Sequence, residues 1–203
     1  GIQLCTELVL GDQTVSEKTK KHLSRIQKES EQIQAVVKSL LTLTGNYTLS
    51  KEPLNVNEII EEITVPKASQ FDYANISFIK CLDEQLPIIC ADKNQMRRVF
   101  TNIIENACAS MAETTTERRL TVRTEKQGES VKITISDTGP GIPKEYLSKI
   151  FEPFFSAKDY KKSKERGLGL SIAYSIVNQH NGSISADSEV GKGATFVIAL
   201  PID

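Results

Sequence analysis

The apolar positions in the first quarter of the chain repeat with the period of a helix. No Gly or Pro occurs between Ser16 and Thr44, and spacings of three and four residues alternate along Leu23, Ile26, Ser30, Ile33, Val37, Leu40 and Thr44. Such a seam is typical of a coiled coil or a helical bundle and needs a partner helix to cover it. Residues 2–10, followed by the turn-like sequence GDQT, have the pattern of the end of that partner. We therefore predict a partial helical hairpin over residues 1–47, and we expect the natural protein to begin before Gly1.

After the linker GNYTLSKEP the pattern changes to short alternating runs and amphipathic helices. We predict one helix with Asn57 as its N-cap, a long helix that starts at Asp92, and a third helix across residues 167–180. Short strands are expected at ISFIKCL and PIICA. Two hairpins are expected, at residues 120–137 around the turn QGE and at residues 183–201 around Gly191-Lys192-Gly193.

Helices and antiparallel hairpins alternate here without a regular βαβ rhythm. This order predicts an α+β fold for residues 48–203: a two-layer sandwich of a mixed, largely antiparallel sheet covered by helices. The coiled-coil-like helical hairpin is expected to precede it as a separate domain.

Composition and charge narrow the possible partners. The chain has 25 Lys+Arg against 26 Asp+Glu, which argues against nucleic acid or an acidic membrane surface as a partner. No apolar run approaches the roughly 20 residues of a membrane span. Cys5, Cys81, Cys90 and Cys108 are widely spaced, so a zinc site or a disulfide framework is disfavoured. We expect a cytoplasmic segment without membrane contact, and any membrane anchor of the parent protein is expected upstream.

Asp137 is the first candidate for chemistry, because it ends an alternating strand and is followed by Gly139 and Gly141. A carboxylate in this position fits a metal ligand, a catalytic acid, or an acceptor for the exocyclic amine of a flat ring that the glycines allow to approach. The alternative is a strand that ends in an Asx turn.

Two further candidates concern phosphate. Gly167 and Gly169 open an apolar helix, where free N–H groups and the helix dipole favour an anion, although a tight turn explains the same glycines. Asn102 and Asn106 lie four residues apart on one helix face, with Glu105 rotated away from it. Inward-facing amides need hydrogen bonds or a metal, and an Asn oxygen suits Mg²⁺ that also holds phosphate. The alternative is a helix with a polar edge.

The stretch FEPFFSAKDYKKSKERG combines aromatic residues with a Lys-rich segment that has no periodicity. This is typical of a mobile lid over a nucleotide, with apolar anchors at its base and Lys158 within reach of a terminal phosphate. The alternative is a solvated loop.

The order of these motifs is more specific than any one of them. NIIENA, DTGPGIP, FEPFF, GLGLS and GKGATF follow one another across residues 92–200. They resemble the N, G1, F, G2 and G3 boxes of sensor histidine kinases, whose ATP-binding domain is shared with gyrase, MutL and the related heat-shock chaperone. Residues 2–50 resemble the family's hairpin for dimerisation and phosphotransfer, and NACASM is similar to the nitrogen-regulation-type branch.

The resemblance implies a role for each matching position. Asn106 matches the Mg²⁺ ligand, Asn102 the second N-box amide, and Asp137 the Asp that binds the adenine amine. Lys158 matches the lid Lys, and Thr195 a residue near adenine on the last strand. The implied ATP-binding set is Asn102, Asn106, Asp137, Gly139, Gly141, Ile142, Lys158, Arg166, Gly167, Leu168, Gly169, Leu170 and Thr195. Within this set the catalytic members are Asn102 and Lys158, and the cofactors are ATP and Mg²⁺.

One departure concerns the lid, because the family commonly has GTGLGLS where this chain has ERGLGLS. A carboxylate at Glu165 would repel phosphates, while Arg166 would offset this by contacting the γ-phosphate. We therefore expect a lid with a different conformational preference.

The resemblance implies phosphoryl transfer from Mg·ATP. Hydrolases of the superfamily carry a water-orienting Glu four residues before the metal Asn, where this chain has Asn102, so transfer to a histidine on the hairpin and relay to a response-regulator aspartate are favoured. No acceptor box of the form His-Glu-x-x-Asn-Pro occurs, and we expect it upstream. His22 is predicted to be a solvated residue and His180 a helix-end residue, so this chain is expected to bind Mg·ATP without phosphorylating itself.

The expected partners are a second copy of the chain, joined through the hairpin, and a response-regulator receiver domain. The alternative function is a nucleotide-regulated dimeric docking module or phosphatase for a response regulator, without kinase activity. A serine kinase of the anti-sigma type is disfavoured by the coiled-coil helix.

Overall fold

The computed structural model describes residues 16, 18–27, 30, 48–112, 114, 117–155 and 167–202. The chain divides into two compact units, Gly1–Asn46 and Tyr47–Asp203. In the first unit, residues 18–27 are helical, and the hydroxyl of Ser16 accepts a hydrogen bond from the N–H of Thr19 (3.3 Å). His22 is exposed on this helix, as predicted. The seam positions beyond Ser30 and the partner helix lie outside the described residues, and the division into a hairpin and an ATP-binding domain stays a prediction.

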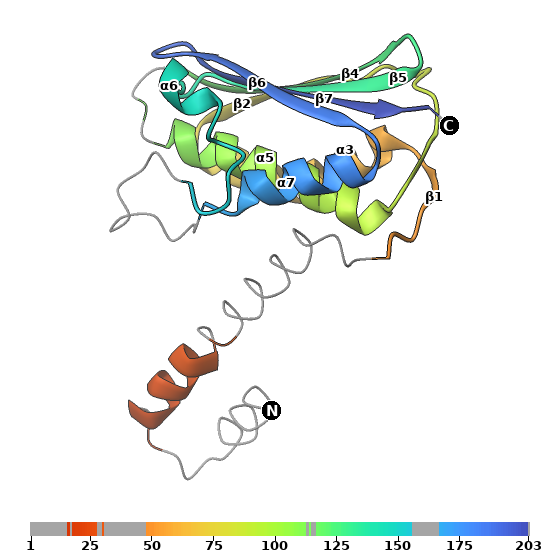
Figure 1. Ribbon diagram of the computed structural model, residues 1–203. Coiled ribbons are helices and arrows are strands. Elements are labelled where there is room, and N and C mark those ends of the chain that lie inside the picture. The colour runs from red at the N-terminus through yellow and green to blue at the C-terminus, as the bar shows by residue number, and fades with distance from the viewer. Residues whose placement is uncertain are drawn as a thin grey trace. The chain divides into compact units, whose positions relative to one another are not determined.

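The second unit contains helices, strands and one 3₁₀ turn in a mixed order. In sequence they are β1 (Glu52–Leu54), α3 (Val56–Thr64), η1 (Val65–Lys67), α4 (Ala68–Tyr73), β2 (Ile76–Cys81), β3 (Ile89–Ala91), α5 (Lys93–Met111), β4 (Arg118–Gln127), β5 (Ser130–Asp137), α6 (Lys144–Leu147), α7 (Gly169–Gln179), β6 (Ser183–Glu189) and β7 (Gly193–Pro201). Figure 1 shows these elements along the chain.

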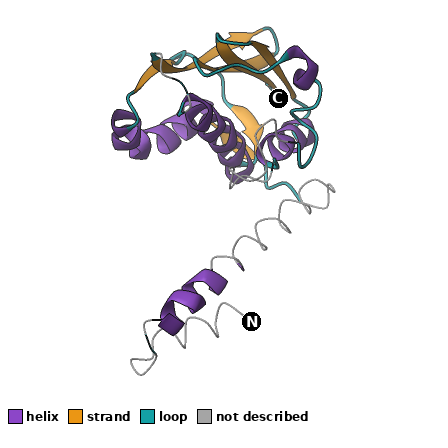
Figure 2. Ribbon diagram, turned by 90° about the vertical axis from the view of Figure 1, so that its left-hand side faces the viewer, coloured by secondary structure: helices purple, strands orange, loops and turns teal. Residues whose placement is uncertain are grey.

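The five-stranded sheet has the order β2-β4-β5-β7-β6. Its one parallel pair is β2 with β4, and the other three pairs are antiparallel. Strands β1 and β3 form a separate antiparallel pair. Helices α3, α5 and α7 lie against one face of the larger sheet, so that sheet and helices form two layers (Figures 1 and 2). The predicted α+β sandwich with a mixed, largely antiparallel sheet is therefore confirmed.

Alternation along the strands explains the two layers. Every second residue of β5 is buried, from Val131 through Ile133 and Ile135 to Asp137, and the residues between them are only half-buried. The buried face of α5 supplies Phe100 and Ile103 to the same core. Each such side chain contributes on the order of 2 kcal/mol through apolar burial. The residues on the opposite face of β5 are Ser130, Lys132, Thr134 and Ser136, so this strand turns a polar face away from the core.

The helix starts show where local patterns succeed and fail. Asp92 caps α5 as predicted, because its carboxylate accepts the N–H of Gln95 (3.1 Å). Helix α3, however, is capped by Asn55 and not by the predicted Asn57. The Asn57 amide instead donates to the carbonyl of Asp83 (2.8 Å) and accepts from Thr124 (2.9 Å). The short helices α4 and α6 were not predicted.

Candidate nucleotide-binding site

The polar edge of α5 meets the start of α7. The Asn102 side chain donates a hydrogen bond to the carbonyl of Gly169 (3.0 Å), and Asn106 lies half-buried one turn further along. Glu105 is exposed and forms an ion pair with Lys67 (2.8 Å). The two amides therefore share an edge from which Glu105 is excluded, as the helical period predicted. This contact joins the N-box segment to the glycine-rich helix start, 67 positions later in the chain.

Asp137 lies at the end of β5 with only 5% of its surface exposed. Its Oδ1 accepts the N–H of Gly139 (2.8 Å) and lies 3.4 Å from the hydroxyl of Ser110, which can donate to it. Burial raises the pKa of this carboxyl above its ordinary value, while hydrogen bonds from the Gly139 and Ala194 backbone and from Ser110 oppose the rise. The Asx turn considered from the sequence is thus present, and it leaves a buried carboxylate that can accept a hydrogen bond from a ligand.

Gly139 has no room for a side chain. A Cβ at this position would lie 2.6 Å from the Ser110 hydroxyl and 2.7 Å from Oδ1 of Asp137. The close approach of these two side chains, and not an unusual φ, explains the glycine.

Thr195 does not reach this site with its side chain. It pairs with Ser136 across β5 and β7, and the two hydroxyls lie 2.8 Å apart. Asp137 pairs with Ala194 on the other face of the sheet. Because side chains alternate along a strand, a shift of one residue moves the side chain to the opposite face. Ala194 occupies the position next to Asp137, and the placement of Thr195 near adenine stays a prediction.

The loop after Asp137 is attached to the hairpin of β6 and β7. Ser188 is buried, accepts the N–H of Ile142 (2.8 Å) and donates to the carbonyl of Gly193 (2.6 Å). Gly141 has a positive φ of 74°, and a Cβ there would collide with the carbonyl of Glu189. Ile142 thus contributes its backbone to holding the loop, and the loop and the hairpin turn form one wall of the site.

Gly167 and Leu168 stand before α7. Gly167 has a φ of 64°, and its carbonyl accepts the N–H of Phe154 (3.0 Å), so the two ends of the predicted lid meet. Leu168 is buried, and Leu170 lies half-buried in the first turn. The first N–H groups of this helix can bind an anion.

Two aromatic residues of the F box pack against helices on either side, and the lid itself stays a prediction. Phe151 packs on Tyr174 of α7 (ring centroids 5.4 Å apart), and Phe155 packs on Tyr146 of α6 (5.6 Å). Lys158, Glu165 and Arg166 lie outside the described residues.

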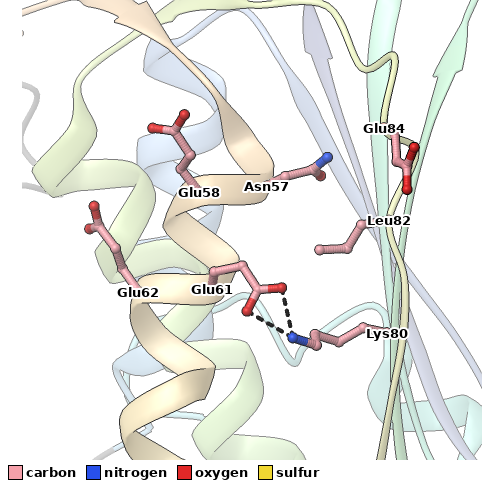
Figure 3. A pocket seen from close by; sticks show the side chains of 7 residues that line it. All are labelled: Asn57, Glu58, Glu61, Glu62, Lys80, Leu82 and Glu84. Atoms are coloured by element: carbon pink, nitrogen blue, oxygen red, sulfur yellow. Dashed lines mark hydrogen bonds and ion pairs between the residues drawn. The ribbon is translucent and has the colours of Figure 1, made fainter.

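A groove of about 650 Å³ lies elsewhere, between α3 and β2 (Figure 3). Two of its four carboxylates form ion pairs. Glu61 binds Lys80 through both oxygens (2.7 and 2.8 Å), and Glu62 binds Lys93 (2.9 Å) and Arg97. It contains none of the predicted site residues, and its charges stabilise the contacts of α3 with α5 and β2.

Sequence reasoning did not identify Ser110, Ser188 or Ala194 as site residues. Each of these three residues contacts a predicted site residue from a segment that is distant in the sequence. For Ala194 a signal was available, because the alternation of β7 places it, and not Thr195, on the face of Asp137.

The layered fold, the buried Asp137 near Ser110 of α5 and the glycine-rich helix start that Asn102 of the same helix contacts are the features of a nucleotide-binding domain of the ATPase type. Residues 91–203 match the family model described as "Histidine kinase-, DNA gyrase B-, and HSP90-like ATPase". Sporulation kinase C of Bacillus subtilis is 33% identical over 86% of this chain and 39% of its own length. The chain belongs to this ATPase family and, within it, to the histidine kinases.

Solved structures agree with this assignment. Full-length ShkA in complex with AMPPNP matches with a TM-score of 0.77 at 20% identity, over 92% of this chain and 39% of that one, and supports the fold. Histidine kinase ThkA in complex with response regulator protein TrrA matches with a TM-score of 0.70 at 25% identity, over 99% of this chain and 59% of that one. The chain spans less than half the length of the curated relatives it matches. Assignment to the nitrogen-regulation-type branch stays a prediction.

Proposed function

We propose that this chain is the ATP-binding catalytic part of a sensor histidine kinase, which transfers the γ-phosphate of Mg·ATP to a histidine for relay to a response-regulator aspartate. The observation that supports this most directly is the Asn102–Gly169 hydrogen bond. This bond brings the edge of α5 that carries Asn102 and Asn106 to the start of α7. Asp137 lies near the other end of that edge, next to Ser110.

In this proposal the nucleotide lies along α5. Asp137 accepts the exocyclic amine of adenine, and the loop with Gly139, Gly141 and Ile142 borders the ring. The phosphates lie at the first turn of α7, around Gly167, Leu168, Gly169 and Leu170, where N–H groups are available. Lys158 and Arg166 of the lid are proposed to bind the terminal phosphate.

The donor set fits Mg²⁺ held together with phosphates. Among the described residues, no group of three or more His, Cys, Asp or Glu is placed to bind a metal ion. Mg²⁺ is commonly held by one or two protein oxygens together with substrate phosphates and water. The half-buried Asn106, on the edge it shares with Asn102, is the proposed protein ligand, and Mg²⁺ would neutralise charge on the phosphates when bound.

Transfer is favoured over hydrolysis by the side chains beside the phosphates. Asn102 carries no carboxylate to orient water, and Glu105 is turned to Lys67 on the exposed side. Positioning of the acceptor then decides the reaction.

Neither histidine of this chain suits the acceptor role. His180 is 2% exposed and both its ring nitrogens are engaged. His22 is exposed but is not part of an acceptor box. We therefore propose that the acceptor histidine belongs to a segment outside these 203 residues.

The proposed partners are a second copy of the chain and a receiver domain. Ile26 is 48% exposed on its helix, as expected for an apolar seam position that a partner helix covers. The ThkA–TrrA complex makes a response regulator a reasonable partner to test. No helix in the described part of the chain is long and apolar enough to cross a membrane.

The test combines binding with transfer. Calorimetry should give ATP binding that requires Mg²⁺ for full affinity, and Asn106→Ala should remove most of the Mg²⁺ dependence. With γ-labelled ATP, the chain alone should show no acid-labile label. A hairpin polypeptide that carries an acceptor box, added in trans, should become labelled only when the chain is present.

Glu105→Gln is the matched control, because Glu105 lies one residue from Asn106 but is turned away from the site. It should behave like the wild type in both measurements. Label on His22 or His180, or equal ATP binding with and without Mg²⁺ in the wild type, would contradict the proposal.

A further inference from the structure

Ser110 stands one turn beyond Asn106 on α5, where the helix passes the end of β5. Its hydroxyl lies 2.8 Å from the carbonyl of Ala107 and 3.4 Å from Oδ1 of Asp137, and its single proton can be donated to either acceptor. The same Oδ1 accepts the N–H of Gly139 (2.8 Å). One carboxylate oxygen of Asp137 is therefore approached from two sides, by the loop and by the helix.

Two contacts on one oxygen restrict how the carboxyl group turns. A carboxylate can rotate about its Cβ–Cγ bond, since this torsion has a broad profile. With Oδ1 held between Gly139 and Ser110, and with the Ala194 backbone also hydrogen-bonded to the carboxyl group, the group keeps one orientation, and Oδ2 is the oxygen that we assign to a ligand amine. The lack of room at Gly139 shows how closely these groups converge, because a Cβ there would lie within 2.7 Å of both side-chain oxygens.

No other hydroxyl in the described part of the chain makes a hydrogen bond to Asp137. Thr138, its neighbour, donates to the carbonyl of Glu117 and accepts from Arg119. Ser136 and Thr195 pair on the opposite face of the sheet. Ala194, directly across from Asp137, has no side-chain hydrogen-bonding group. Support for Asp137 from a side chain thus comes from α5.

We propose that Ser110 is a positioning residue for adenine recognition: it orients the Asp137 carboxylate so that Oδ2 accepts the 6-amino group of the nucleotide. The inference rests on the proposed function of Asp137. At 3.4 Å the O–H···O contact is longer than the roughly 2.7 Å usual for such bonds, and binding contacts often shorten when the ligand arrives. In the proposal, the single Ser110 proton turns from the Ala107 carbonyl to Asp137 when the nucleotide binds. Ser110 acts on the amino group through Asp137.

The experiment compares two ligands in three variants. ATP and purine riboside triphosphate, which has hydrogen in place of the 6-amino group, differ only in the group that Asp137 accepts. In Ser110→Ala we expect ATP affinity to fall by about three- to tenfold, the effect of one hydrogen bond, while affinity for the analogue changes little. The preference for ATP over the analogue should fall by the same factor.

Ser136→Ala is the matched control, because it removes a hydroxyl from the opposite face of β5 and should leave the preference unchanged. Asp137→Asn should abolish the preference. Alanine is favourable in a helix, and a melting curve of Ser110→Ala will show that the variant is folded.

The outcomes separate the two levels of the argument. If Ser110→Ala weakens both ligands equally, or weakens neither, while Asp137→Asn abolishes the preference, the role of Ser110 is wrong and that of Asp137 stands. If the wild type itself does not distinguish ATP from the analogue, the adenine role of Asp137 fails, and the role of Ser110 fails with it.

Discussion

The backbone N–H of Asp92 donates a hydrogen bond of 3.0 Å to Nε2 of His180, 88 positions later in the chain. Because a backbone N–H can only donate, Nε2 must be unprotonated, and Nδ1 carries the proton that it gives to the carbonyl of Ile176 (2.8 Å). The contact joins the C-terminus of α7 to the N-terminus of α5. At the N-terminus of α7, Asn102 from the middle of α5 meets Gly169, so α7 is joined to α5 by a side-chain contact at each of its two ends.

This arrangement predicts a pH-dependent stability. Burial lowers the pKa of His180 from its ordinary value of 6.5, so the unfolded chain binds its proton more readily than the folded one. The contribution of His180 to the free energy of unfolding is fully present above about pH 6.5. It is lost as the pH falls below that value toward the lowered pKa of the folded state. Urea unfolding of the wild type and of His180→Gln between pH 7.5 and 5 should show that the variant lacks this loss.

The difference between the pH profiles of the wild type and His180→Gln isolates the contribution of His180. This comparison is needed because Asp137 changes stability with pH in the opposite direction. Its raised pKa makes the folded state bind a proton more readily, so its contribution to stability increases as the pH falls. Parallel pH profiles for wild type and His180→Gln would contradict the prediction.

Asp137→Asn should separate binding from stability. A buried carboxylate with a raised pKa costs folding free energy at neutral pH, and Asn can keep the acceptor for the Gly139 N–H. We expect an unchanged or higher melting temperature together with a loss of ATP affinity of roughly tenfold or more, since a charge-assisted hydrogen bond is lost. Differential scanning fluorimetry with and without ATP measures both effects.

Asp187→Asn on β6 is the control, because Asp187 is exposed. It should change neither quantity. Unfolding of Asp137→Asn at neutral pH would mean that the carboxylate is structural.

The two glycines of the β6–β7 turn should respond differently to alanine. Both have positive φ, 84° at Gly191 and 95° at Gly193. A Cβ at Gly191 meets open space, whereas at Gly193 it collides with the carbonyl of Asp137. We expect a loss of about 1 kcal/mol for Gly191→Ala, from φ alone, and of about 2 kcal/mol or more for Gly193→Ala. The second variant should also lose ATP affinity, because Asp137 moves.

Chemical denaturation in urea gives both free energies. Equal losses in the two variants would show that the backbone of β5 yields to the added methyl group.

Asn102→Asp tests the junction of α5 and α7. The change keeps the size of the side chain but removes the donor to the Gly169 carbonyl and adds a negative charge beside the proposed phosphates. ATP affinity should fall by roughly tenfold. Glu105 lies three residues after Asn102 on α5. Glu105→Gln should change ATP affinity by no more than about twofold, because the ion pair of Glu105 with Lys67 is exposed. Similar effects from both variants would place the phosphates elsewhere.

Much of the fold followed from local rules. The start of α5 at Asp92, the turn with Gly128 at a φ of 60°, and the end of α7 at His180 depend on caps and turns within a few residues. Such features are determined by the chain itself. For Asn55 and Asn57 the local rule failed, because both residues suit a cap and a tertiary contact with Thr124 engages the second.

The site divides in the same way. The sequence by itself determined the order of the boxes, the shared edge of Asn102 and Asn106, and the strand that ends in Asp137, because period and spacing act along one segment. Only the tertiary structure decided which segments meet Asp137: Ser110 from α5, and β7 in the register that sets Ala194 across from it. Register between strands and the approach of a helix to a sheet depend on pairing across tens of residues. A one-residue change in that pairing would exchange the side chains that reach the ligand.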